Sequence, residues 1–208
     1  MSEAGRKWSL APQIEGCRGW FKNHRASLEK HGPVEILRWR EPGSGIFAVN
    51  YTIGFRHGLL AVDGDIGEAI YRWNADLKWP FLTGCSLGYF AEKCKASETG
   101  HEFRQWYPQK AQAEIHEHEY FFVNDSPSDF PAFNKNKNVL LRAAGSSHEW
   151  DHALHDLNEG VDGVEAVLGY DWVETWPEVG YDHHLRLIGH WLGLRMAWEQ
   201  LQAGKEAP

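Results

Sequence analysis

The chain has 208 residues, a formal net charge of −8, and 11 tryptophans beside 10 phenylalanines and 7 tyrosines. That length is enough for one large domain or two small ones with a buried core. No apolar run approaches 18 residues, so we expect no membrane-spanning helix, and the N-terminal sequence lacks the apolar segment of a secretory signal. Only three cysteines occur, Cys17, Cys85 and Cys94. This odd, sparse set indicates a reducing compartment, and we expect a cytoplasmic protein.

Charge is distributed unevenly along the chain. Residues 1–142 contain 18 Lys and Arg against 17 Asp and Glu, whereas residues 143–208 contain 3 against 12. Between Ala143 and Leu185 there are ten acidic residues and no Lys or Arg. Such a segment repels nucleic acid and attracts a basic surface or a cation. We therefore expect no direct binding of nucleic acid and no membrane partner.

The N-terminal half predicts one helix and a small sheet. Apolar residues recur at helical spacing at Ile14, Cys17, Phe21 and Leu28. This spacing predicts an amphipathic helix over 13–31 that ends at Gly32-Pro33. The segments VEILRW, GIFAVNYTI and LLAV then predict three short strands, separated by turn-rich loops. Because these loops are too short for crossover connections, we expect an antiparallel meander.

Further helices are predicted after the meander. In GDIGEAIYRW, residues 64–73, Asp65 stands where an N-cap would and Glu68 follows at capping-box spacing, so we expect a short helix there rather than a metal site. Helical segments are also expected within 86–97 and 101–120. Residues 126–138 are polar and contain proline, which predicts a long loop or a subdomain boundary.

The last predicted helix, over 182–202, has the clearest pattern. Its apolar stripe consists of Leu187, Trp191, Leu194, Trp198 and Leu201. The stripe should pack on the sheet or another helix, and a homodimer contact through it stays open. The chain thus predicts an α+β fold with a small antiparallel three-stranded sheet, packed with helices, and a mainly helical C-terminal half. We expect an α+β domain over 1–125 and an acidic subdomain over 139–208, or one continuous domain.

Two segments resemble a family of phage and prophage accessory proteins of unknown function. Residues 64–73 resemble its GD-x-GEA pattern, residues 89–100 its YFA-x-KC-x-ASE-x-G pattern, and WREPGSGIFAVNY at 39–51 its W-x-x-PG-x-x-I pattern. The resemblance covers about residues 35–110. It implies a small phage protein made in the bacterial cytoplasm that acts against a host defence system, in the manner of an anti-CRISPR protein.

The segment HEWDHALHD, His148–Asp156, contains the H-E-x-x-H spacing of zinc hydrolases. A helix capped by Ser146 or Ser147 would place four side chains on one stripe, namely His148, His152, His155 and Glu159. Its opposite side would carry Trp150, Ala153, Leu154 and Leu157. The segment therefore predicts an amphipathic helix with a histidine-rich acidic face.

A zinc hydrolase is one interpretation of this face. Zinc would be held by His148 and His152, with His155 nearby, and Glu149 would activate a bound water. Against it, Asp151 stands between the histidines, where zinc-protease helices are mostly uncharged, and Asn158 replaces the third histidine of the extended motif. We therefore expect no catalytic residue and no metal, and zinc hydrolysis is the alternative.

The interpretation we favour is a binding protein. The acidic segment would dock on a basic, nucleic-acid-binding surface of a host defence protein and imitate phosphates in charge. The candidate contact residues are Asp151, Asp156, Glu159, Asp162, Glu165, Asp171, Glu174, Trp172 and Trp176. A further alternative is a small-nucleotide pocket in which phosphates bind the arginines near the sheet, namely Arg38, Arg40, Arg56 and Arg72. Solvated charges at the edges of strands are the simpler explanation of those arginines.

Overall fold

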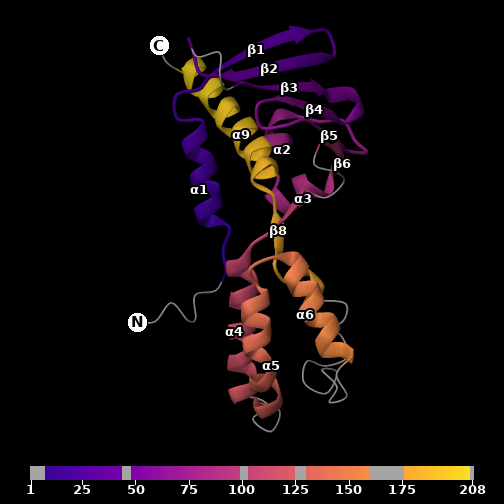
Figure 1. Ribbon diagram of the computed structural model, residues 1–208. Helices are drawn as coiled ribbons and strands as arrows, with labels where there is room; N and C mark the ends of the chain where they lie inside the picture. The colour runs from indigo at the N-terminus through magenta and orange to yellow at the C-terminus, as the bar shows by residue number, and fades with distance from the viewer. Residues whose placement is uncertain (1–7, 44–47, 99–102, 125–129, 160–175, 207–208) are drawn as a thin grey trace. The chain divides into compact units, whose positions relative to one another are not determined.

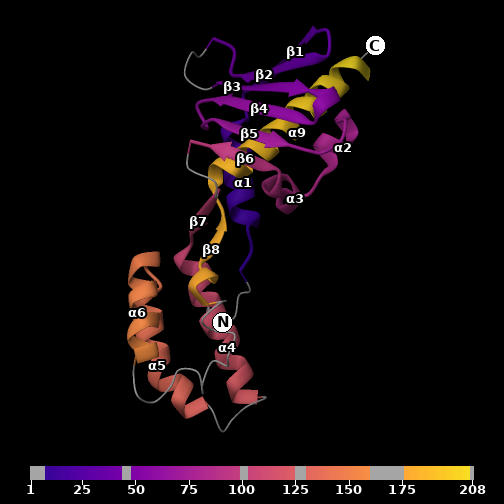
Figure 2. The same ribbon diagram turned by 90° about the vertical axis from the view of Figure 1, so that its right-hand side faces the viewer.

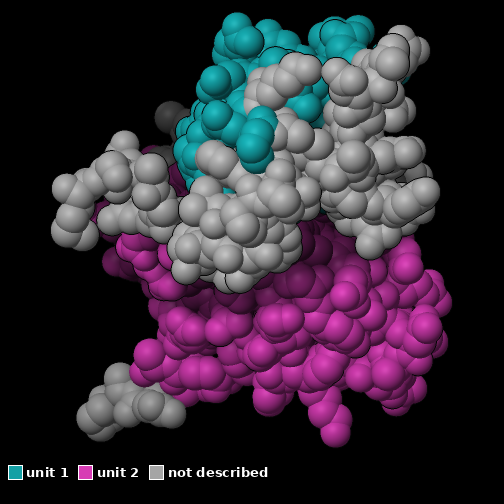
Figure 3. Space-filling view, turned by 90° about the horizontal axis from the view of Figure 1, so that it is seen from below, with its two compact units in different colours: residues 1–9, 104–182 teal, residues 10–103, 183–208 magenta. Residues whose placement is uncertain are grey.

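The structure is a computed structural model that describes residues 8–43, 48–98, 103–124, 130–159 and 176–206 (Figures 1 and 2). The chain forms two compact units, coloured separately in Figure 3. The sheet unit contains residues 10–103 and 183–208, and the helical unit contains residues 1–9 and 104–182. The predicted α+β class is confirmed. Within the described ranges, no helix combines the length and apolarity needed to cross a membrane.

A six-stranded antiparallel sheet forms the centre of the sheet unit. Its strands, in spatial and chain order, are β1 (Arg25–His31), β2 (Val34–Arg40), β3 (Ala48–Gly54), β4 (Leu59–Gly64), β5 (Ala69–Arg72) and β6 (Cys94–Ser97). The three predicted strands correspond to β2, β3 and β4, and their meander is confirmed. The prediction of only three strands is wrong, because the meander continues on both sides.

The predicted helix over 13–31 is too long. Helix α1 spans Ala11–Trp20, and β1 follows after a short turn. Leu28 packs against the core from a strand, because residues of β1 alternate between the two faces of the sheet. Gly32 has a φ of 61°, which a glycine adopts readily, and this turn joins β1 to β2. The Gly-Pro pair therefore ends a strand, although it was predicted to end a helix.

The predicted helix over 64–73 is also wrong. Asp65 does not cap a helix: its carboxylate accepts a hydrogen bond from the backbone N–H of Ala48 at 2.6 Å, and its own N–H donates to the Ala48 carbonyl at 3.0 Å. The GD pair thus fastens the end of β4 to β3. Ala69 and Tyr71 are buried whereas Ile70 and Arg72 are exposed, so burial alternates with the two-residue period of a strand.

The helices of the sheet unit lie on one face of the sheet (Figures 1 and 2). They are α1, α2 (Trp79–Gly84), α3 (Leu87–Glu92) and α9 (Leu185–Glu206), and a 3-10 turn, η1, spans Phe55–His57. Helix α9 lies across the sheet, and α1 packs on α9. The predicted last helix is therefore confirmed, with a later start.

The apolar stripe of α9 is wider than predicted. Leu187 and Leu194 are fully buried, while Trp191, Trp198 and Leu201 are partly buried and pack against the core. Ile188 and Leu192 are buried as well, in a second cluster with Cys17 of α1. Because α9 has the sheet on one side and α1 on another, it buries more than one stripe.

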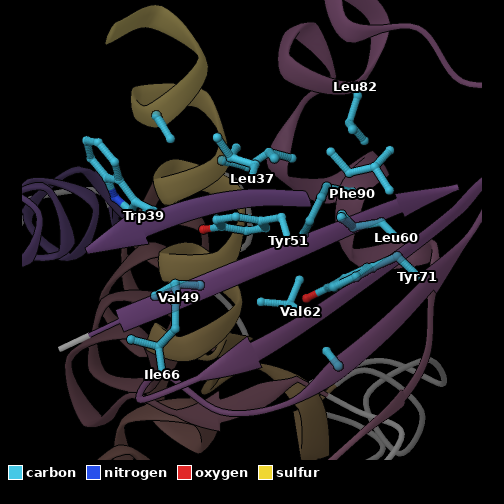
Figure 4. Packing of buried hydrophobic residues seen from close by; sticks show 14 of the residues in the cluster. Leu37, Trp39, Val49, Tyr51, Leu60, Val62, Ile66, Tyr71, Leu82 and Phe90 are labelled. Atoms are coloured by element: carbon cyan, nitrogen blue, oxygen red, sulfur yellow. The ribbon is translucent and has the colours of Figure 1, made fainter. Parts of the chain in front are cut away.

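A buried histidine joins α9 to the sheet. The Nδ1 atom of His190 lies 2.8 Å from the Tyr71 hydroxyl, and its Nε2 lies 3.1 Å from the Gly67 carbonyl oxygen. Since a carbonyl can only accept, Nε2 carries the proton and Tyr71 donates to Nδ1. The Tyr51 hydroxyl donates to the His190 carbonyl at 3.1 Å. Figure 4 shows both tyrosines among the buried residues of this face. Burial lowers the pKa of His190 to about 4.

The helical unit contains three described helices around its own core. These are α4 (Pro108–Asn124), α5 (Phe130–Ala143) and α6 (Ser147–Glu159), followed by a 3-10 turn, η2 (Trp176–Glu178). Strands β7 (Arg104–Trp106) and β8 (Tyr181–His183) pair with each other. The core includes Ile115, Leu140, Trp150 and Trp176.

Two expectations about organisation change. Of the predicted loop over 126–138, residues 126–129 lie outside the described part of the chain and residues 130–138 belong to α5. Val139 and Leu140 pack in the core of the unit, and the polar NKNKN run continues the same helix. Both units also combine distant segments. The observed units do not coincide with the predicted ranges 1–125 and 139–208, since α9 packs with the N-terminal sheet.

The neutral, buried His190 makes stability depend on pH. Its folded pKa of about 4 lies below the ordinary value near 6.5, so the unfolded chain binds more protons between these values. The contribution of neutral His190 to the free energy of unfolding is therefore complete above pH 6.5. About 3 kcal/mol of it is lost as the pH falls toward 4. Urea unfolding from pH 7 to pH 4 should show this loss in the native chain and not in His190→Gln. If the free energy of unfolding fell equally in the two proteins between pH 7 and pH 4, His190 would not be the group responsible.

Two glycines of α9 provide a matched pair. A Cβ on Gly193 would lie 2.4 Å from the Tyr51 hydroxyl and 2.9 Å from a ring carbon of Phe21, whereas one on Gly204 would meet nothing within 4 Å. Gly193→Ala should lower the free energy of unfolding by about 1–3 kcal/mol through overpacking. Gly204→Ala should raise it by about 0.5 kcal/mol because alanine favours helix. Chemical denaturation of both variants tests the difference in sign.

Candidate functional site

The histidine-rich segment forms helix α6, as predicted. The Ser146 hydroxyl accepts a hydrogen bond from the Glu149 backbone N–H at 3.2 Å and caps the helix. On one side, Trp150, Ala153 and Leu154 are buried in the core of the helical unit. This arrangement fixes which side chains of α6 face solvent.

A pair of stacked tryptophans holds α6 in place. The Trp150 indole N–H donates to the Trp176 carbonyl oxygen at 2.7 Å, and the two rings stack with centroids 5.8 Å apart and planes 7° apart. The Trp106 ring packs on the Trp150 ring with centroids 5.7 Å apart. The Trp106 indole N–H donates to the Ala144 carbonyl oxygen at 2.9 Å. The indole N–H groups of Trp150 and Trp106 therefore both have backbone acceptors.

Trp176 was predicted to contact a partner, and the structure places it elsewhere. Its side chain is 2% exposed, and His118 of α4 packs on its ring at 4.9 Å. The acidic neighbours of Trp176 suggested a surface, but the 3-10 turn η2 directs its ring against α6. In this fold it supports α6 and presents no side-chain surface to a partner.

The other side of α6 is exposed and polar. Its exposed side chains include His148, Glu149, Asp151, His152, His155 and Asp156. The rings of His148 and His152 lie edge to face with centroids 4.5 Å apart, so the one-turn spacing brings two imidazoles together as predicted. Among the described residues, no group of three or more His, Cys, Asp or Glu is arranged to hold a metal ion. Zinc binding therefore stays a hypothesis that rests on two histidines.

The structure brings together only part of the predicted partner surface. Asp151 and Asp156 are both exposed on α6. Glu159 is the last residue of α6, and its side chain is outside the described part. The remaining candidates, Asp162, Glu165, Asp171, Trp172 and Glu174, lie outside the described residues.

The three thiols are poor nucleophiles in this environment. Burial raises the pKa of Cys17 to about 11. It also raises the pKa values of Cys85 and Cys94. Because the thiolate is the reactive form, a raised pKa lowers its population at neutral pH.

The four arginines of the nucleotide alternative do not form one pocket. Arg38 and Arg40 lie on β2, whereas Arg72 lies on β5, with two strands between them, which is a distance of roughly 14 Å. The Arg38 guanidinium donates to Glu29 at 2.7 Å and holds the pKa of that carboxyl below its usual range. Arg56 is in η1.

Arg72 instead borders a groove that the sequence interpretation missed. Its other charged and aromatic walls come from Lys78, Phe81, Tyr89, Lys93 and Lys95. The available signal was the interleaving of basic and aromatic residues between positions 78 and 95. That signal was missed because residues 86–97 were predicted to be helical, whereas only Leu87–Glu92 form a helix, α3, and Cys94–Ser97 form β6.

Trp150 should be the residue on which the placement of α6 depends. Trp150→Ala removes the stacked pair and an indole hydrogen bond, and should lower the free energy of unfolding by about 3–5 kcal/mol. His152→Ala, on the exposed side of the same helix, should change it by less than about 0.5 kcal/mol. Denaturant unfolding of the two variants measures both. Similar losses in both would contradict the assigned faces of α6.

Comparison with known proteins adds no relative. No family model matches the chain, and neither a curated protein nor a solved structure matches it. The resemblance of residues 64–73 and 89–100 to phage accessory proteins is thus a hypothesis from motifs alone. In the structure, the first of these motifs has a clear local role, because it closes the turn between β4 and β5 and supplies the Gly67 carbonyl to His190.

Proposed function

We propose that the protein acts by binding, as a phage-encoded inhibitor of a bacterial defence system. The exposed face of α6 docks on a basic surface of a host protein that otherwise binds nucleic acid. The observation that carries this proposal is the composition of α6: it contains four Asp and Glu and no Lys or Arg, and its opposite side is buried. A buried side and an acidic side give a surface of fixed shape and one sign of charge.

Rigid presentation supports a binding role for this face. The stacked indoles of Trp150 and Trp176 and the Ser146 cap hold α6 before any partner arrives. Binding then costs little ordering of the backbone, which favours affinity. Like charges on one face also attract an oppositely charged surface over a distance and speed association at low salt.

A second candidate function is zinc-dependent hydrolysis. The observation that favours it is the contact between the His148 and His152 rings, with Glu149 beside them on the exposed side of α6. Further ligands would have to come from other parts of the chain or from substrate and water. The two candidate functions differ in their need for Glu149, which hydrolysis requires as the base and docking does not.

Reversing charge on α6 should abolish partner capture. In a pull-down from bacterial host lysate, analysed by quantitative mass spectrometry, Asp151→Lys with Asp156→Lys should lose the host protein that the native chain captures. The loss should be larger near 0.01 M salt than near 0.15 M, since the screening length is about 30 Å in the first and about 8 Å in the second. The control is Glu117→Lys with Glu199→Lys, which makes the same change of charge at two other exposed positions. Equal capture by both double variants would contradict docking through α6.

Glu149 separates the two functions. If α6 is a docking face, Glu149→Gln should weaken capture only slightly, because it removes one of four negative charges and keeps the shape of the side chain. If α6 is a zinc site, protein prepared without a histidine tag should contain stoichiometric zinc, and Glu149→Gln should abolish turnover while the metal stays bound. The second pattern would overturn the proposed function.

A further inference from the structure

The sheet unit contains a groove of about 570 Å³, within the usual size of small-ligand sites. It is formed where the end of β5, the 73–78 segment, α2, α3 and the start of β6 meet. None of these elements belongs to the helical unit, so the groove is independent of the α6 face.

Positive charge dominates the walls of the groove. Four cationic side chains line it, Arg72, Lys78, Lys93 and Lys95, against the two carboxylates of Asp76 and Glu92. The Lys93 ammonium nitrogen lies 3.9 Å from a carboxylate oxygen of Glu92. The side chains of the other three cations form no hydrogen bond or ion pair with the described part of the chain. A local excess of cations on a chain with a net charge of −8 favours a small anion over a long polyanion.

Two exposed aromatic rings stand beside these cations. Phe81 is 46% exposed and Tyr89 is 37% exposed, and they are two of the four large hydrophobic residues exposed within the described ranges. Their rings meet edge to face with centroids 6.0 Å apart, and the Lys93 ammonium lies 4.1 Å from the centre of the Tyr89 ring. Aromatic rings next to cations suit a ligand that combines a flat ring with phosphates.

The fold holds these walls in place from behind. Leu82 of α2 and Phe90 of α3 are fully buried, which fixes the exposure of Phe81 and Tyr89 on the same two helices. Trp79, at the start of α2, stacks on Trp198 of α9 with centroids 4.2 Å apart. The aromatic pair is therefore presented by anchored helices.

The 73–78 segment is anchored as well. The Trp73 N–H donates to the Gly58 carbonyl, and the Leu77 N–H donates to the Phe55 carbonyl, each at 2.8 Å. Gly58 has a φ of 61°, and a Cβ there would lie 2.3 Å from the Trp73 carbonyl oxygen, so only glycine allows this approach. The fold therefore holds this wall of the groove in place.

We propose that this groove binds a mononucleotide. The base packs on the exposed ring of Phe81, and the phosphates are bound by Arg72, Lys78 and Lys95. Charge alone would bind any phosphate, and the aromatic ring alone would bind any flat apolar group. The two together select a ligand in which a base and a phosphate are joined.

The test is isothermal titration of the full chain with ADP and with inorganic pyrophosphate, at about 0.15 M salt. We expect saturable binding of ADP. Phe81→Ala should weaken ADP binding about tenfold and leave pyrophosphate binding within about twofold, because only ADP has a base to stack. Lys78→Glu should weaken the binding of both, since it acts on the phosphates.

Two matched controls lie outside the groove. Lys22→Glu makes the same change of charge, and Ile70→Ala truncates another exposed apolar residue; neither should alter ADP binding. Asp151→Lys with Asp156→Lys should also leave it unchanged, so failure here is distinguishable from failure of the α6 proposal. Circular dichroism melting confirms that each variant is folded.

Three results would overturn the proposal. The first is the absence of saturable ADP binding to the native chain. The second is ADP binding that Phe81→Ala and Lys78→Glu leave unchanged. The third is binding of a single-stranded RNA oligomer more than about tenfold tighter than ADP, which would indicate a nucleic-acid groove instead.

Discussion

The sheet unit depends on the way helix α9 lies on the sheet. A histidine with no exposed surface, His190, lies at that interface, and its polar atoms are hydrogen-bonded, as most buried polar groups are. Tyr71 and Gly67 satisfy the His190 ring, Tyr51 satisfies its carbonyl, and Gly193 gives Tyr51 room. These contacts require one register of α9 against β3 and β5. Apolar burial alone would allow the helix to slide, so the polar contacts specify its position.

That position also determines the groove. Helices α2 and α3 are short, and they rest on α9 through the stacked rings of Trp79 and Trp198 and through the hydrogen bond from the Trp191 indole to the Cys85 carbonyl at 2.9 Å. The same logic applies in the helical unit, where indole contacts hold α6 and leave its acidic side exposed. In each unit, buried aromatic residues with satisfied N–H or O–H groups place a charged surface. The two surfaces have opposite charge.

The sequence correctly predicted the elements whose apolar spacing fits only one kind of secondary structure. The alternation in β2 to β4, the long apolar stripe of α9 and the two-sided pattern of α6 could each be interpreted correctly from spacing. Where the pattern has two meanings, the prediction failed. The spacing of Phe21 and Leu28 fits a helix and also a turn followed by a strand, and the Asp65–Glu68 spacing fits a capping box although Asp65 bonds to Ala48 on a neighbouring strand. The burial of Trp176 could not be predicted, because it depends on contacts with α6 and α4, and the groove was missed although all its walls come from residues 72–95.

The claim that α9 fastens the sheet can be measured directly by native-state hydrogen exchange of the full chain. If it is correct, amides of α9 between Leu187 and Ala197 exchange with the same opening free energy as those of β3 and β4, because α9 cannot leave without unfolding the sheet. The whole set should be the slowest to exchange in the sheet unit. The account is contradicted if the α9 amides exchange through a smaller opening while β3 and β4 stay protected.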